Sequence, residues 1–236
     1  MEKQLELNQE EKLVEEIKEE SQLIPQSVSY VHGLESGLNG SKHRYLQNSF
    51  QKCYYVSMNM SLWNIKKKNS LLRNLCTNFF RPSRAAEESL KGCLKIQEDE
   101  LKINKPDIIL GSSWGGGIGL LMVSEGIWDG PIVLCCPALK YLLDKVGQTP
   151  KYKWNEIVDR INKKNLGKNI VIIHGTKDKT VPYQNSLDCS KQIKDCQLIT
   201  IENGDHKLND YIIKNDKLKG IMYDLYKKYK LEQLNK

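Results

Sequence analysis

The segment from Pro106 to Leu121 constrains the fold of this chain more than any other feature. Its sequence is PDIILGSSWGGGIGLL, in which a short apolar run enters Gly111-Ser112-Ser113-Trp114-Gly115 and a glycine-rich stretch follows. Asp107 to Leu110 has the length and β-branched content of a buried strand, and Gly115 to Glu125 is compatible with a helix. Glycines two residues before and after Ser113 permit a sharp turn between them. The segment predicts a strand, a tight turn and a helix, with the Ser113 hydroxyl exposed at the apex.

Strands and helices alternate along the rest of the chain. Apolar runs predict strands at 27–32, 54–59, 107–111, 132–136, 169–174 and 197–201. Helices are expected at 41–50, 84–103, 115–125, 152–162, 183–194 and 209–233. This order favours a three-layer α/β/α fold with a mostly parallel sheet of about six strands and helices on both faces.

The chain divides by composition into two parts. Residues 1–24 are rich in glutamate and are expected to form an acidic tail, helical or disordered. Residues 25–236 are expected to form one domain, and a chain of 236 residues is long enough to bury a substantial core.

Two further predicted strands end in residues that complement Ser113. The strand at 169–174 runs into Gly175-Thr176-Lys177-Asp178, and the strand at 197–201 runs into Glu202-Asn203-Gly204-Asp205-His206. Loops at the carboxyl ends of parallel strands converge, so we expect Ser113, Asp178 and His206 to meet. A serine hydroxyl becomes a nucleophile when a base takes its proton and a third group orients that base. His206 is the candidate base, and Asp178 is the candidate orienting acid.

Two other carboxylates compete with Asp178 for this role. Asp205 adjoins His206, and neighbouring side chains seldom face each other. Asp188 is expected inside a helix, whereas the orienting acid belongs in a loop at a strand end. The pattern therefore favours Asp178, with Asp205 and Asp188 as the alternatives.

Other polar residues near the predicted site have simpler interpretations. Ser112 is the alternative nucleophile, but it enters the turn and does not occupy its apex. His32 and His174, each at the end of a predicted strand, are expected to brace turns and not to transfer protons.

The region from about Ser27 to the C-terminus resembles the α/β-hydrolase superfamily. The Gly-x-Ser-x-Gly turn and the order Ser, Asp, His are typical of that family. His32-Gly33-Leu34, after the first predicted strand, is similar to the His-Gly turn at its oxyanion hole. The resemblance implies a small serine hydrolase with little or no cap domain, whose oxyanion is held by backbone amides. It implies Leu34 and Trp114 as those amides, and His32, Gly33, Gly111 and Gly115 as residues that shape the turns.

This interpretation predicts cleavage of a carboxylic ester or thioester through an acyl-enzyme, with no cofactor. An acyltransferase or an amidase would use the same triad. The alternative from another class is a non-catalytic protein of this fold that binds a ligand or partner in the same cleft. The presence of all three triad residue types together with the His-Gly turn favours the enzyme.

Composition argues against several other classes. No apolar run approaches the ~20 residues needed to cross a bilayer, and the charged N-terminal region lacks a signal sequence, so a cytoplasmic location is expected. The seven cysteines are scattered and form no Cys-x-x-Cys pair, which favours reduced packing residues and no metal site. The net charge of +7 comes from dispersed lysines without interleaved aromatic residues, so no nucleic-acid partner is expected.

The segment from Leu62 to Arg84 is long for a connection between a strand and a helix. Three lysines at 66–68 precede apolar residues at near-helical spacing, from Leu71 to Phe79. One hypothesis is a small flap over Ser113 that supplies walls of an acyl pocket and contacts acidic or membrane-surface substrates, with peripheral membrane contact. The alternative is an ordinary helix whose apolar stripe packs on the core.

Overall fold

A computed structural model describes residues 22–34 and 40–235 of the chain. Within these ranges, six strands form one sheet in the order β2-β1-β3-β4-β5-β6. The strands are β1 (Ser27–Val31), β2 (Lys52–Tyr54), β3 (Ile108–Ser112), β4 (Ile132–Cys135), β5 (Ile170–Gly175) and β6 (Gln197–Ile201). Every pairing between neighbouring strands is parallel, as predicted. The predicted acidic tail lies outside the described residues except at positions 22–24.

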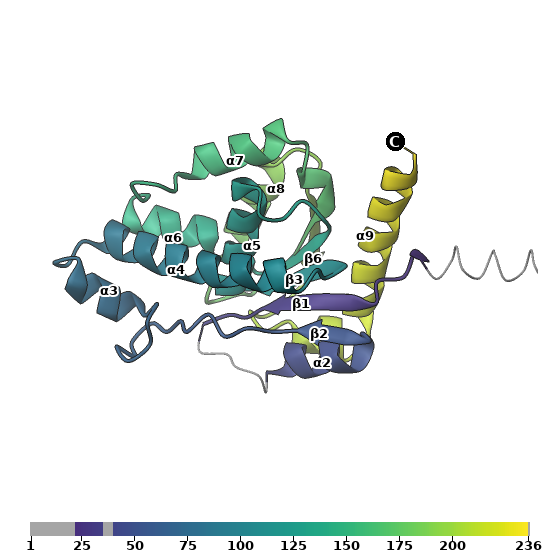
Figure 1. The fold of residues 1–236 in the computed structure, drawn as a ribbon, viewed down its shortest axis with the longest axis horizontal. Helices are drawn as coiled ribbons and strands as arrows, with labels where there is room; N and C mark the ends of the chain where they lie inside the picture. The colour runs from purple at the N-terminus through teal and green to yellow at the C-terminus, as the bar shows by residue number, and fades with distance from the viewer. Residues whose placement is uncertain (1–21, 35–39, 236) are drawn as a thin grey trace, which may run out of the picture.

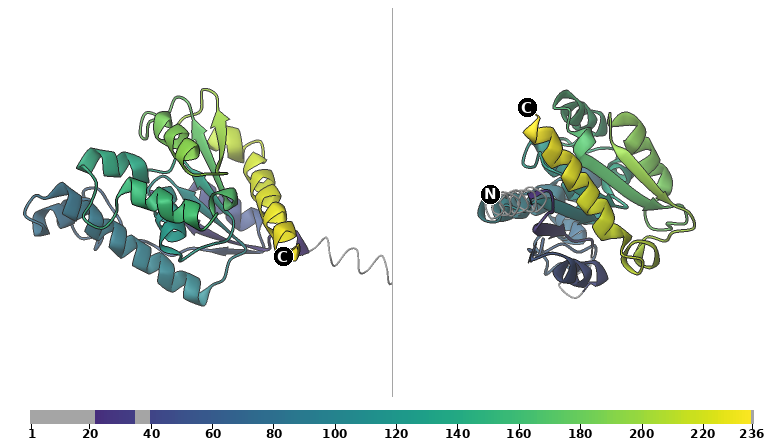
Figure 2. Two further views of the ribbon diagram at one scale, coloured as in Figure 1. Left: turned by 90° about the horizontal axis from the view of Figure 1, so that it is seen from above. Right: turned by 90° about the vertical axis from the view of Figure 1, so that its right-hand side faces the viewer.

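Helices cover both faces of this sheet (Figure 1). Their bounds are α2 (Ser41–Ser49), α3 (Leu71–Thr77), α4 (Pro82–Ile103), α5 (Trp114–Glu125), α6 (Leu139–Val146), α7 (Trp154–Lys163), α8 (Tyr183–Gln192) and α9 (Lys217–Leu234). α2 and α9 cover one face, α4 to α8 cover the other, and α3 packs on α4. Figure 2 shows α9 lying across its face of the sheet. The predicted three-layer fold is confirmed, and no helix within the described ranges has the length and apolar character needed to cross a membrane.

The core consists of two clusters because side chains alternate between the faces of each strand. In β3, Ile109 packs in the cluster under α4 and α5, while Ile108 and Leu110 pack in the cluster under α2 and α9. All three side chains are fully buried. The central strands therefore read as unbroken apolar runs, which is why the sequence identified them well.

Two predicted elements differ from the structure by more than two residues at one end, whereas the others agree to within two. The strand predicted at 54–59 is wrong in position, because β2 ends at Tyr54. Beyond it, the Met58 amide donates to the ring of His32 and Asn59 adopts a φ of 51°, so the chain leaves the sheet. The helix predicted at 209–233 is divided, since Asp216 has a φ of 52° between a π-helical turn at Asn209–Ile213 and α9.

Candidate active site

Ser113 lies at the junction between β3 and α5, in a backbone conformation that few residues adopt. Its φ is 55° and its ψ is −113°, which places a non-glycine residue in a strained region. The backbone packs closely on both sides of Ser113, and only glycine fits at positions 111 and 115. A methyl group on Gly115 would lie 2.0 Å from the carbonyl oxygen of Val31, and one on Gly111 would lie 2.8 Å from the carbonyl oxygen of Gly115. Both predicted turn glycines are therefore required by packing.

The backbone of Ser113 is tied to the neighbouring strand. Its amide donates to the carbonyl of Cys135 at 2.8 Å, and its carbonyl accepts from the amides of Gly117 and Ala138, each at 3.0 Å. These three bonds hold the turn in place, which leaves the hydroxyl to project from the carboxyl end of β3.

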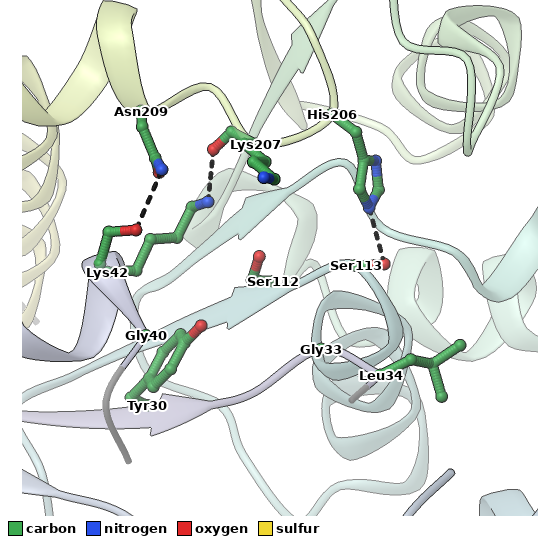
Figure 3. A pocket seen from close by; sticks show the side chains of 11 residues that line it. Tyr30, Gly33, Leu34, Gly40, Lys42, Ser112, Ser113, His206, Lys207 and Asn209 are labelled. Carbon is green, nitrogen blue, oxygen red and sulfur yellow. Dashed lines mark hydrogen bonds between the residues drawn. The ribbon is translucent and has the colours of Figure 1, made fainter. Parts of the chain in front are cut away.

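The structure brings the three predicted triad residues together. The Nε2 atom of His206 lies 3.0 Å from Ser113 Oγ (Figure 3), and its Nδ1 atom lies 2.6 Å from Asp178 Oδ2. Because a carboxylate only accepts, Nδ1 carries the proton and Nε2 can accept the Ser113 hydroxyl. The side chain of His206 is 23% exposed, whereas that of Asp178 is fully buried. The arrangement can transfer a proton from Ser113 to His206.

Asp178 is held as a carboxylate by several donors. Its Oδ1 atom accepts from the amides of Thr180 at 2.7 Å and Val181 at 2.9 Å. Burial alone would raise the pKa of Asp178, but hydrogen bonds from His174, His206 and these two amides outweigh burial and hold the pKa well below its usual range.

The two alternative carboxylates are engaged elsewhere. Asp205 accepts from the amide of Leu208 at 2.8 Å. Asp188 accepts from the side chain of Gln184 at 2.7 Å. Neither forms a hydrogen bond with His206, whereas Asp178 does. Ser112, the alternative nucleophile, is the last residue of β3 and hydrogen-bonds Tyr30.

The ring of His32 contacts the backbone of the turn after β1 and of the segment beyond β2. The ring is buried, with Nδ1 at 2.7 Å from the Gly33 carbonyl and Nε2 accepting the Met58 amide at 2.9 Å. Burial lowers the pKa of His32, so the neutral ring with its proton on Nδ1 is favoured. The Gly33 carbonyl and the Leu34 amide belong to one planar peptide, so this hydrogen bond also orients the Leu34 N–H.

The two predicted oxyanion donors flank the site. Leu34 lines the cavity beside Ser113 (Figure 3). Trp114 is the first residue of α5, and amides in the first turn of a helix have no acceptor within that helix. The backbone N–H groups of both residues are thus candidates to bind an oxyanion.

A cavity of about 300 Å³ opens beside Ser113 and His206. Its other described lining residues are Tyr30, Gly33, Leu34, Gly40, Ser41, Lys42, Ser112, Lys207 and Asn209. No residue of the 62–84 segment is among them, so the hypothesis that this segment supplies walls of the pocket is wrong. Sequence reasoning missed Lys42, since helix periodicity does not distinguish it from the solvent-facing lysines.

The 62–84 segment instead forms a separate apolar groove. This groove has a volume of about 230 Å³ and lies between the start of the segment, α3, α4 and α6. Trp63, Leu72 and Leu75 contribute to it, and Leu71 also packs on the core. After α3, Phe79 and Phe80 are 86% and 74% exposed. The alternative interpretation, a helix packed on the core, therefore describes only part of the segment.

One group of potential metal ligands occurs among the described residues. The ligand atoms of Cys136, Asp178 and His206 all lie within 4.8 Å of one another. Two of these side chains already hydrogen-bond each other. Burial raises the pKa of the Cys136 thiol, and a neutral thiol is a poor ligand. The group is accounted for by the triad.

Comparison with known proteins identifies the fold. No family model and no curated protein matches the chain. In structure it is similar to Est1E from Butyrivibrio proteoclasticus, with 18% identity and a TM-score of 0.54 over 89% of this chain and 88% of the other. It is also similar to alpha/beta hydrolase domain-containing protein 10 from mouse (16%, 0.57, 86% and 90%) and to dienelactone hydrolase from Anabaena variabilis (15%, 0.51, 87% and 87%). The chain therefore has the α/β-hydrolase fold.

Proposed function

We propose that this chain is a serine hydrolase that cleaves a carboxylic ester or thioester through an acyl-enzyme. The observation that carries the proposal is the pair of contacts on His206, at 3.0 Å to Ser113 Oγ and 2.6 Å to Asp178 Oδ2. Ser113 and His206 both line a cavity that a small substrate can enter, while Asp178 lies buried behind His206.

In the first half of the reaction, Ser113 Oγ attacks the carbonyl carbon of the ester while His206 Nε2 takes the hydroxyl proton. The electron pair of the carbonyl moves to its oxygen, which the amides of Leu34 and Trp114 stabilise. Each such donor typically lowers the barrier by ~3 kcal/mol. The intermediate then collapses, and the leaving alcohol or thiol takes the proton from His206.

In the second half, water attacks the acyl carbon and gives a proton to His206. The bond between the acyl carbon and Ser113 Oγ breaks, the acid leaves, and the proton returns to Ser113. Throughout, Asp178 keeps the imidazole in the required tautomer and stabilises its protonated form.

Strain at Ser113 favours catalysis over ligand binding alone. A non-glycine residue at a φ of 55° destabilises the fold by about 1–3 kcal/mol. A protein that only binds a ligand in the cleft does not need the serine at this apex. An acyltransferase would need it, and differs only in the acceptor of the second step.

A neutral fluorophosphonate probe tests the proposal. Probe labelling should occur in the wild type, disappear in Ser113→Ala and persist in the matched control Ser112→Ala. Absence of labelling in the wild type, or its loss in Ser112→Ala alone with an unchanged melting temperature, would contradict the assignment. Hydrolysis of ethyl acetate with and without an added alcohol then separates a hydrolase from an acyltransferase.

A further inference from the structure

Lys42 occupies an unusual position for a lysine on a surface helix. It belongs to the first turn of α2 and lines the cavity together with Ser113 and His206 (Figure 3). The residue is only 7% exposed. Its ammonium group donates to the carbonyl oxygen of Lys207 at 2.5 Å. Lys207 directly follows His206, so the ammonium group of Lys42 is hydrogen-bonded to the residue next to the proposed base.

The charge of Lys42 has no carboxylate partner in the part of the chain that the structure describes. The ion pairs found there are all formed by other residues. An ammonium has three N–H donors, and the Lys207 carbonyl accepts one of them. Buried charges are normally paired because burial of a lone charge is strongly unfavourable. The remaining donors of Lys42 therefore suit an anion that enters the cavity.

The rest of the cavity wall supports a negatively charged ligand. Its described residues include Lys42 and Lys207 but no aspartate or glutamate. The hydroxyl of Tyr30 and the side chain of Asn209 add neutral polar groups (Figure 3). A positively charged cleft concentrates anions. A volume of about 300 Å³ is at the small end of ligand pockets, which suits a compact polar group better than a long alkyl chain.

We propose that this cavity binds an anionic group on the substrate, with the Lys42 ammonium as its counter-ion. The inference rests on the proposed function and names its substrate class, a small ester or thioester that carries a carboxylate or a phosphate-like group. Lys207 is exposed, so water screens its charge and its contribution is smaller.

Three ethyl esters of similar shape test the proposal. Monoethyl succinate carries a carboxylate, ethyl 4-methylpentanoate replaces that carboxylate with an isopropyl group, and ethyl 3-phosphonopropanoate carries a phosphonate. The wild type should hydrolyse at least one anionic ester with a kcat/KM about tenfold or more above that of the neutral ester, because charge-assisted hydrogen bonds are strong. The comparison between the two anionic esters distinguishes the carboxylate from the phosphate-like group.

Variants then assign the preference to Lys42. Lys42→Met keeps the length of the side chain and removes its charge, so the ratio of anionic to neutral kcat/KM should fall about tenfold, to near one. Lys42→Arg should retain most of the ratio. Lys52 is exposed on β2 and does not line the cavity, so Lys52→Met is the matched control and should leave the ratio unchanged.

Two alternative roles of Lys42 predict different results. A lysine that only tethers the loop at Lys207 predicts equal loss for charged and neutral esters in Lys42→Met, and that result would overturn the proposal. Glu35, the acidic residue nearest to Lys42 in sequence, lies outside the described residues. If the wild-type ratio of anionic to neutral kcat/KM is near one and rises about tenfold in Glu35→Gln, Glu35 is the counter-ion of Lys42. That result would also overturn the proposal.

A measurement on the wild type keeps the proposal testable if Lys42→Met fails to fold. Succinate or 3-phosphonopropanoate should slow fluorophosphonate labelling of Ser113 more than 4-methylpentanamide does at the same concentration, and equal protection by all three compounds would overturn the proposal. The failure of the hydrolase assignment is distinguishable, because it appears as an absence of labelling. Normal labelling with a ratio near one in wild type and in Glu35→Gln would reject only the anion site.

Discussion

His174 Nε2 lies 3.1 Å from Asp178 Oδ2, the same oxygen that accepts the hydrogen bond from His206. The ring of His174 is fully buried at the end of β5. Its Nε2 also lies 2.9 Å from the Val181 carbonyl, and its Nδ1 lies 2.6 Å from the Ser186 hydroxyl. Nε2 faces two acceptors and therefore carries the proton, while Nδ1 accepts from Ser186. The orientation of the carboxylate thus depends on a second histidine behind it.

We predict that His174→Leu lowers kcat about 10-fold to 100-fold with little change in KM, because a carboxylate that shifts moves the base out of line. His174→Gln retains a donor that can reach Asp178 and should recover part of kcat. Steady-state kinetics on a neutral ethyl ester, with melting temperatures of both variants, check this. Equal loss of kcat in both variants would show that His174 acts only through packing.

Asp178→Asn should preserve the fold and lower kcat by up to about 10⁴-fold, because an amide stabilises the wrong tautomer of His206. Asp205→Asn and Asp188→Asn are matched controls, since these carboxylates accept hydrogen bonds from Leu208 and Gln184 and not from His206. Their kcat values should stay close to that of the wild type. Collapse of activity in one of these two variants, with near-normal turnover in Asp178→Asn, would transfer the role to that residue.

The features that sequence predicts well are those that depend on local patterns. The apolar runs of β3, β4 and β5 locate these strands in the sequence. Ser113, Asp178 and His206 follow the carboxyl ends of β3, β5 and β6, and their convergence follows because these strands are parallel. Ser113 at a positive φ follows from the flanking glycines.

Contacts that depend on the detailed path of loops could not be predicted in this way. The approach of His174 to Asp178 depends on how residues 178–181 fold back over the end of β5. The burial of Lys42 depends on the position of α2 against the loop at Lys207, far away in sequence. The short β2 deviates from the predicted strand because Met58 bonds a histidine ring and not a neighbouring strand.

The stability of the protein should depend on the protonation of His32. Burial lowers the pKa of this ring in the folded state, whereas in the unfolded chain it is about 6.5. Below that pH the unfolded state binds the proton more readily, so the free energy of unfolding should decrease as pH falls from about 6.5 toward the folded pKa. The lowered pKa of Asp178 affects the free energy of unfolding in a separate pH range, below about 4.

Melting temperatures at pH 7.5 and pH 5.5 check this prediction. The decrease between the two should be larger for the wild type than for His32→Gln, whose amide does not titrate. An identical decrease in both proteins would assign the pH dependence to another group.

Phe79 and Phe80 should not influence chain-length preference. Neither lines the cavity beside Ser113, and both are highly exposed. The double variant Phe79→Ala/Phe80→Ala should therefore show the wild-type ratio of KM values for ethyl octanoate and ethyl acetate, with an unchanged melting temperature. A selective rise in KM for octanoate would place these rings over the site after all.

Peripheral membrane contact stays a prediction, and the same exposed rings are the place to test it. Basic residues at 66–68 and at Arg81 and Arg84 share the segment with Trp63, Phe79 and Phe80, and no acidic residue occurs between positions 36 and 86. Exposed aromatic and basic side chains together favour an anionic bilayer surface. We expect sedimentation with vesicles rich in phosphatidylserine but not with phosphatidylcholine vesicles, and loss of sedimentation in the double phenylalanine variant. Equal sedimentation of variant and wild type would show that the rings do not enter the bilayer, and no sedimentation of either would contradict the membrane contact itself.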